Sequence, residues 1–250
     1  MYRIAGLLSV LLGNASFVLG DFPAAYAHLL TAEQLAREVG DHRLLASVKV
    51  DQSTVALWDG DVEGALSLAR EGQRYAISGA QRALLAVRCE ARALARMNDR
   101  SGVFEALRRA ERELPSQPLG DDVDGAWWSC GPGDLELYTG ISLLWLGQPG
   151  DAAPYARQAI VCYQAAPVPF QYPSNQAQSQ VNVAICMVHQ GHPEEGVRLA
   201  TDALGLTRGA TKPCLQQAGE LLTALRLRHG DLAATREFAE RLRSLRSGRG

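Results

Sequence analysis

The chain has 250 residues, of which 47% are hydrophobic but only 6% aromatic, so alanine and leucine supply much of its apolar content. Its formal net charge of -2 excludes a strong overall field that would attract nucleic acid or anionic lipid. Five cysteines, odd in number and without a C-x-x-C pair, argue against a disulfide framework and predict reduced thiols in a cytoplasmic protein.

The segment from Ile4 to Leu19 is the most apolar stretch of the chain. Its large side chains recur at the spacing of one helical face, which predicts a helix. The alternative is the hydrophobic region of a signal peptide, with Arg3 as a minimal basic start. The stretch is short for a membrane span, so we expect a soluble helix and no membrane partner.

One turn signature recurs along the whole chain and predicts where helices end and begin. Its glycine or asparagine stands at positions 20, 60, 98, 147, 191 and 230, which are 40, 38, 49, 44 and 39 residues apart. We expect each to adopt the left-handed conformation that closes a helix, and the following Asp or Pro to open the next. A second break lies inside each period, so the sequence predicts twelve helices in six hairpins.

These turns divide the chain into six antiparallel hairpins within a single domain over residues 1–250. Their approximate bounds are 1–40, 41–79, 80–115, 134–168, 174–209 and 211–247, with a loop insertion at 115–133. A loop of that length in a compact array is usually functional or disordered.

Small residues recur where the two helices of each hairpin should cross. The first hairpin has Gly13 in its first helix and Ala25 and Ala32 in its second. Corresponding positions in the later hairpins are residues 65, 103, 152, 196 and 235, and residues 72, 110, 159, 203 and 242. A large side chain there would push the helices beyond the usual 8 to 10 Å separation. The pattern resembles the tetratricopeptide repeat (TPR), which implies an all-α, right-handed α-solenoid.

Runs such as Leu57-Trp58-Asp59-Gly60-Asp61 and Leu143-Leu144-Trp145-Leu146-Gly147 also resemble the C-terminal TPR half of actinobacterial regulators that carry a Cro-type helix-turn-helix. The preference for Arg over Lys agrees with such a source. The resemblance implies a sensor or regulatory module of a transcriptional regulator. DNA would be bound only through a separate domain that this chain does not include.

Polar residues on the first helices of the hairpins are the candidates for ligand binding, because TPR arrays bind in the groove that those helices line. Asn14 could grip a peptide backbone with its amide. Arg88 and Arg92 are four residues apart and could clamp a carboxylate or phosphate. The alternative for both arginines is an ion pair with Glu90, Glu71 or Asp51. Asp51 is itself a candidate ligand-binding residue.

Two further groups complete the predicted binding residues. Gln178 and Asn182 share a face of the first helix in the fifth hairpin. The alternative to ligand binding is that this face is simply exposed to solvent. Trp127 and Trp128 lie in the insertion and could cap the groove near Tyr138, or merely fill a gap between hairpins.

The constellations that carry enzyme chemistry are missing from the sequence, so we predict no catalytic residues, no metal site and no cofactor. His189 and His192 straddle a predicted helix end and form an accidental pair rather than a zinc site. Cys130 is the one cysteine in a Gly/Pro-rich loop, where exposure could make it reactive, although an inert thiol is the simpler expectation.

Three functions therefore compete. The first is a sensor that binds a small molecule or peptide in its groove, and the second is a constitutive protein-interaction adaptor. The third, which the sequence supports least, is an enzyme on a helical scaffold. An enclosed, partly aromatic pocket would favour the sensor, and an open polar channel a peptide or protein partner. A homodimer is possible through an end hairpin with exposed apolar residues.

Overall fold

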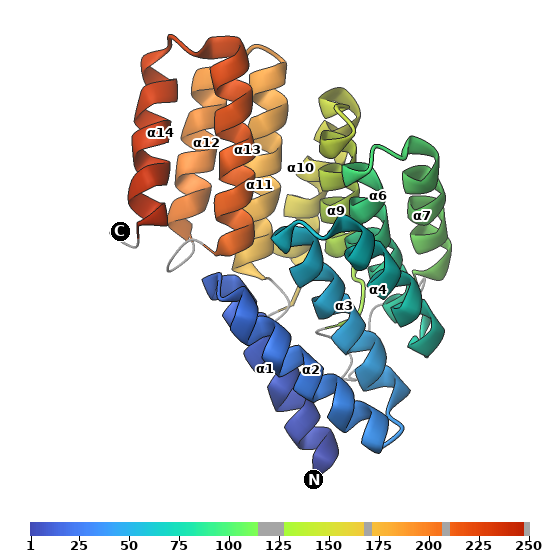
Figure 1. Cartoon of the computed structure of the whole chain (residues 1–250). Coiled ribbons are helices and arrows are strands. Elements are labelled where there is room, and N and C mark those ends of the chain that lie inside the picture. Colours follow the sequence, from blue (N-terminus) through green and yellow to red (C-terminus); the bar gives the residue numbers. More distant parts are fainter. Residues whose placement is uncertain (115–127, 168–171, 207–210, 248–250) are drawn as a thin grey trace. The chain divides into compact units, whose positions relative to one another are not determined.

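The computed structural model describes residues 1–114, 128–167, 172–206 and 211–247, and these are helical throughout, with no strand among them (Figure 1). The helices are α1 (Tyr2–Leu19), α2 (Phe22–Glu38), α3 (His42–Asp59), α4 (Val62–Tyr75), α5 (Gly79–Leu84), η1 (Leu85–Glu90), α6 (Ala91–Arg96), α7 (Arg100–Glu113), α9 (Pro132–Trp145), α10 (Pro149–Ala165), α11 (Pro173–His189), α12 (Pro193–Leu206), α13 (Lys212–His229) and α14 (Ala233–Arg246). Since α5, η1 and α6 are one continuous helix, the described chain contains the twelve helices that the sequence predicts. The all-α class is confirmed.

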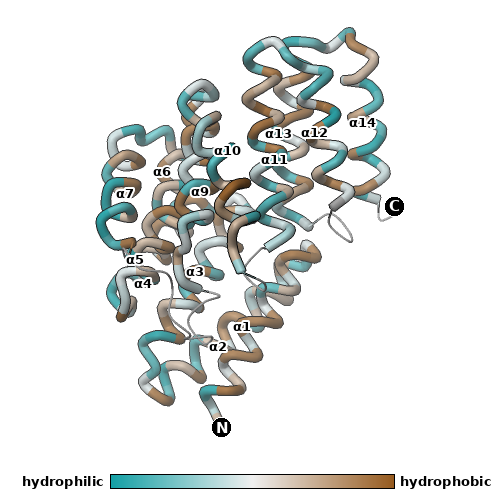
Figure 2. Tube along the Cα trace, turned by 180° about the vertical axis from the view of Figure 1, so that it is seen from behind, coloured by the Kyte–Doolittle hydropathy of each residue, from teal (hydrophilic) through white to brown (hydrophobic). Residues whose placement is uncertain are grey.

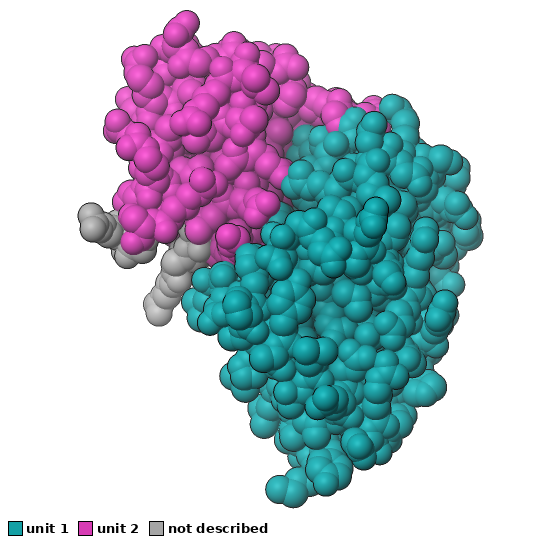
Figure 3. Space-filling model, viewed as in Figure 1, with its two compact units in different colours: residues 1–146 teal, residues 147–250 magenta. Residues whose placement is uncertain are grey.

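The chain divides into two compact units, residues 1–146 and 147–250 (Figure 3). The sequence led us to expect one domain over residues 1–250, and the division falls inside the predicted hairpin 134–168, between α9 and α10. In unit 1, α1 packs on α2, α3 packs on α4, and α6 packs on α7 and α9. In unit 2, α11 packs on α10, α12 and α13, and α14 packs on α12 and α13.

The recurrent turns close the helices as expected, with one exception. Gly20, Gly60, Asn98, Gly147 and Gly191 all adopt positive φ angles, between 58° and 98°. Asp21, Asp61 and Asp99 then accept a backbone N–H of the next helix with their side chains, as N-caps do. Gly230 contradicts the prediction, because its φ of -59° is that of a right-handed helix. Its turn is closed by Thr235, whose hydroxyl donates to the carbonyl of His229.

The twelve predicted crossing positions in the second helices are all buried. Gly13 shows why size matters there: a Cβ added to it would lie 2.8 Å from Leu29 Cγ on α2. A Cβ on Gly72 would lie 2.7 Å from Leu85 Cδ2 in the same way. The small residues therefore let successive helices approach closely.

Helix α3 is the centre of unit 1, because every side chain from Leu44 to Trp58 is buried. A helix buried on all sides is normally apolar all round. This one carries Lys49, Asp51 and Gln52, so unit 1 must partner charged groups inside its core.

Candidate functional site

Three first helices of unit 1 contribute a line of hydrogen-bonded polar side chains. Asn14 on α1 donates its Nδ2 to Asp51 Oδ1 on α3, at 3.5 Å. Arg88 in η1 places its Nη2 3.4 Å from the same oxygen. Each contact joins residues 37 positions apart, close to the repeat period, so the three occupy corresponding places in successive hairpins.

Asp51 is the hub of this line. Its other oxygen, Oδ2, accepts a hydrogen bond of 3.1 Å from the indole Nε1 of Trp128, which lies in the insertion and is itself buried. Burial raises the pKa of Asp51, although Arg88, the indole and Asn14 act in the opposite direction. Burial therefore disfavours the ionised form of Asp51 more than its three partners favour it.

Arg92 on α6 lies beside this hub and is only 2% exposed. Its guanidinium carbon stands 4.9 Å from the ring centre of Tyr138 and 5.8 Å from that of Trp58, so it is held against two aromatic faces. Its Nε donates to the carbonyl of Arg88. Its Nη2, also buried, has no hydrogen-bond partner within the described residues.

Burial lowers the pKa of Arg92 to about 10, so the group is still protonated at neutral pH. No carboxylate of the described chain lies within ion-pair distance of it. A buried charge without a counter-ion is costly, and proteins seldom retain one unless it serves a purpose.

A π-helical turn carries Arg88. Residues Leu85–Glu90 form η1, which interrupts the helix between α5 and α6. The i,i+4 spacing of Arg88 and Arg92 predicted a shared face on a regular helix, and both still reach Tyr138 across the irregular turn, at 5.9 and 4.9 Å. Single π-helical turns are rare and occur frequently at functional sites.

The structure thus brings most of the predicted binding residues together in unit 1: Asn14, Asp51, Arg88, Arg92, Trp128 and Tyr138. We call these six the arginine cluster. Trp127 lies outside the described residues. Trp58, which the sequence marked only as part of a run that resembles actinobacterial regulators, also borders the cluster through its ring.

Gln178 and Asn182 lie in unit 2 and are both buried, at 6% and 0% exposure. Gln178 donates to the carbonyl of Ser174 one turn earlier, and Asn182 Oδ1 accepts from Gln217 Nε2 on α13 at 2.9 Å. Sequence reasoning missed Gln217, although its distance of 35 residues from Asn182 is close to the repeat period. Helix α11 begins at Pro173, so Ser174 lies inside the helix rather than at its N-cap.

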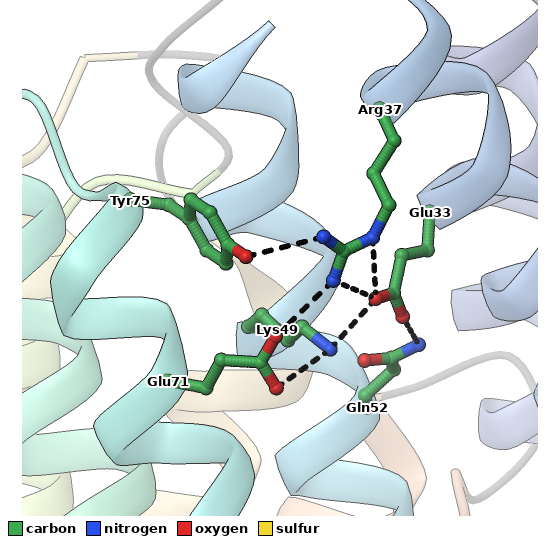
Figure 4. Close-up of polar contacts among 6 residues, drawn as sticks. All are labelled: Glu33, Arg37, Lys49, Gln52, Glu71 and Tyr75. Carbon is green, nitrogen blue, oxygen red and sulfur yellow. Dashed lines mark hydrogen bonds and ion pairs between the residues drawn. The ribbon is translucent and has the colours of Figure 1, made fainter. Parts of the chain in front are cut away.

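A second polar cluster surrounds Lys49, two residues before Asp51 on α3 (Figure 4). Lys49 Nζ lies 3.0 Å from Glu33 Oε1 and 3.0 Å from Glu71 Oε2. Arg37 pairs with both carboxylates, and Gln52 donates to Glu33 Oε2 at 2.7 Å. Burial would raise the pKa of Glu33, but hydrogen bonds from Arg37, Gln52 and Lys49 outweigh it and lower that pKa to about 2.

The remaining candidates offer little chemistry. Cys130 is buried rather than exposed, and burial raises the pKa of its thiol well above the usual value, which disfavours the reactive thiolate. Within the described ranges, no three His, Cys, Asp or Glu side chains stand close enough to hold a metal ion.

Two clefts open elsewhere in unit 1. One, of about 590 Å³, lies beside α4, α6 and α7 and is lined by Arg70, Glu90 and Arg109 among others. The other, of about 420 Å³, shares Arg70 with it. Both arginines of the larger cleft are already paired with Glu90, with Arg70 Nε 3.6 Å from it.

No family model matches the sequence, and no curated protein is significantly similar to it. The candidate site therefore rests on its own geometry.

Proposed function

We propose that this chain is a non-catalytic, ligand-binding module of the TPR kind, a right-handed solenoid of about six hairpins. Its ligand would bind against the first helices of unit 1, at the arginine cluster. Support comes from the recurring hairpins, from the small residues at their crossings, and from the line of polar side chains at corresponding positions.

The observation that carries the proposal is the buried, unpartnered Nη2 of Arg92. Asp51 and Asp134 both act electrostatically on Arg88, whereas no carboxylate of the described residues acts on Arg92 in this way, and a single cation of this kind suits a carboxylate better than a phosphate dianion. The rings of Tyr138 and Trp58 offer apolar contact to the rest of such a ligand. A small organic acid and the C-terminus of a peptide share this chemistry.

In the cell, we propose that the module is cytoplasmic and is the sensor half of a bacterial transcriptional regulator. Each hairpin of a solenoid contacts only its neighbours, so a ligand that draws three successive first helices together would alter their relative rotation. A DNA-binding domain on the same or another chain would respond to that change. The resemblance to actinobacterial regulators supports this context.

A constitutive protein-interaction adaptor is the second candidate. The two clefts that share Arg70 favour it, because they are lined by charged side chains of both signs along α4 and α7. Such a surface suits a protein partner better than a small acid.

Native mass spectrometry of the purified chain is the first test, because a bound acid can co-purify with it. Calorimetry should then compare benzoate, succinate, inorganic phosphate, and one tripeptide with a free or amidated C-terminus. We expect binding of at least one carboxylate and rejection of the amidated peptide. At a ligand concentration of about 100 times Kd, binding should stabilise the fold by about 2.7 kcal/mol.

Two variants locate the site. Arg92→Met removes the buried charge, and we expect it to abolish binding while leaving stability within about 1 kcal/mol of the original chain, or above it. Arg70→Met, in the clefts, should bind the ligand as before. If no carboxylate binds and Arg92→Met unfolds the protein, then Arg92 is structural; if only Arg70→Met loses binding, the site is the cleft.

A further inference from the structure

Helix α1 has two faces of opposite character. Gly6, Val10, Gly13 and Phe17 are buried, and a Cβ on Gly13 would lie 2.8 Å from Leu29 Cγ on α2, while one on Gly6 would lie 2.8 Å from Leu44 Cδ2 on α3. On the face turned away from α2, large apolar side chains are open to solvent. They are Ile4, Leu8, Leu11, Leu12 and Leu19, exposed by 64%, 55%, 44%, 52% and 85%. With the exposed Ala15, we call them the α1 stripe.

The spacing of the α1 stripe is that of a coiled-coil seam. Ile4, Leu8, Leu11 and Ala15 follow one another at steps of four, three and four residues. Alternating steps of four and three residues, as in a coiled-coil heptad, keep a seam facing a partner helix. The 18 residues of α1 give about five turns for such a contact.

No charge opposes pairing of this face with a copy of itself. Arg3 is the one charged residue of α1, and its Nε pairs with Asp41 Oδ2 at 3.0 Å. Two α1 helices can therefore meet without bringing like charges together. Figure 2 shows the contrast with α14, where α1 is mainly brown and α14 mainly teal.

The outer face of α14 is charged, with Arg236, Glu237, Glu240, Arg241 and Arg243 all exposed. A polar outer face is what the end of a helical array needs to remain soluble by itself. The exposed face of α14 is therefore charged, whereas that of α1 is apolar and suits contact with a partner.

The area suffices for a stable contact. The exposed fractions of the α1 stripe correspond to roughly 600 Å² on one copy, or about 1,200 Å² for a pair, at the lower end of specific interfaces. A monomeric protein rarely leaves so large a continuous apolar patch open.

A lipid bilayer is the competing occupant. By length and composition α1 is the one described helix that could cross a membrane, with 22% of it buried inside the structure. Insertion would require α1 to leave α2 and α3, against which Gly13 and Gly6 respectively fit closely, and would break the contact of Asn14 with Asp51. A second copy can cover the stripe without disturbing either.

We propose that the α1 stripe is a homodimer interface, in which the α1 helices of two copies pack against each other about a two-fold axis. The contact is isologous, because the same residues meet from both sides. It is independent of the arginine cluster, since the stripe and Asn14 occupy different faces of α1.

Sedimentation equilibrium of the full chain tests this directly. We expect a dimer for the original chain, and at least a hundredfold larger dissociation constant for the double variant Leu8→Glu/Leu11→Glu, because pairing would bury four carboxylates. Leu30→Glu on α2 is the matched control, since Leu30 is exposed by 57% but lies outside the stripe; it should still dimerise. Circular dichroism checks that each variant is folded. If the charged double variant is not folded, Leu8→Gln/Leu11→Gln takes its place in the experiment.

Two results would overturn the proposal. One is a monomeric original chain over the whole concentration range, or an unchanged dimer in the folded double variant. The other is binding to vesicles of phosphatidylglycerol and phosphatidylcholine that the double variant abolishes, without any dimer in solution, which would assign the stripe to a membrane.

Discussion

Two buried cations of unit 1 have opposite surroundings. Lys49 lies 3.0 Å from a carboxylate oxygen of Glu33 and 3.0 Å from one of Glu71, so the fold supplies its counter-ions (Figure 4). Arg92 is as deeply buried, yet it contacts two aromatic rings and a backbone carbonyl, and one of its nitrogens has no partner among the described residues. A buried cation with a purely structural role has its counter-ions within the same fold. A cation without them suggests that the anion comes from outside.

Helix α3 separates the two environments. Lys49 and Asp51 are two residues apart, so their side chains point to opposite sides of the helix. Lys49 faces the second helices, through Glu33 on α2 and Glu71 on α4. Asp51 faces the first helices, through Asn14 on α1 and Arg88 in η1. In the proposed solenoid the first helices would line the ligand groove, and the unsatisfied cation lies on one of those helices.

Replacing Lys49 should have the largest effect on stability. Lys49→Met leaves Glu33 and Glu71 in a part-buried site with Arg37 as their remaining cation, and we expect a loss of about 2–3 kcal/mol. Arg92→Met, the same exchange of a buried cation for an apolar side chain, should cost less than about 1 kcal/mol. Urea unfolding followed by circular dichroism measures both. Equal losses in the two variants would remove the distinction between the clusters.

The Trp128 indole should contribute less. Trp128→Phe keeps an aromatic ring but removes the hydrogen bond to Asp51 Oδ2, and leaves that buried oxygen without its donor. We expect a loss of about 1–2 kcal/mol in urea unfolding. Trp58→Phe is a suitable control, because it retains an aromatic face near Arg92 and breaks no hydrogen bond to Asp51. A larger loss in the control would mean that ring packing, rather than the hydrogen bond, determines the stability of the cluster.

The sequence predicted the helices and most of the arginine cluster because both depend on the repeat. Glycines, one asparagine and small crossing residues recur at a period near forty, and these positions are determined by backbone geometry alone. Asn14, Asp51 and Arg88 were found because they are polar residues on first helices. Their mutual contacts follow from the same period.

What the sequence could not predict depends on tertiary packing. Nothing in Leu85–Glu90 signals a π-helical turn, which forms where the helix adapts to several neighbours. The Lys49 cluster was missed because no pattern in the sequence marks α3 as a helix that is buried on all sides. Gln217 could have been found by stepping one period on from Asn182. At Gly230 a side-chain hydrogen bond replaces the glycine turn, and the turn pattern gave no sign of it.

The contributions of Glu33 and Asp51 to stability should change with pH in opposite directions. These changes are the smallest of the expected effects. The pKa of Glu33 is lowered from 4.5 to about 2, so the folded state binds fewer protons than the unfolded state between these values. This contribution to stability is present above pH 4.5 and is lost as the pH falls toward 2. The pKa of Asp51 is raised from 3.8, so the folded state holds its proton longer, and stability declines as the pH rises above 3.8.

Variants that cannot titrate separate these two contributions from general acid unfolding. Relative to the original chain, Glu33→Gln should be less stable at pH 6, and the difference should shrink by pH 3, because Glu33 then becomes protonated in the unfolded state while it stays ionised in the folded state. Asp51→Asn should show the reverse: its cost should be largest near pH 3.5 and should fall as the pH rises, because the original chain then ionises a carboxyl that burial disfavours. Thermal unfolding at pH 3 to 6, with shifts of about 2 °C, is sensitive enough. If both differences changed with the same sign, the carboxylate of Asp51 would be as well compensated as that of Glu33. The arginine cluster would then be a structural ion network like that around Lys49, and the case for an external anion would rest on Arg92 alone.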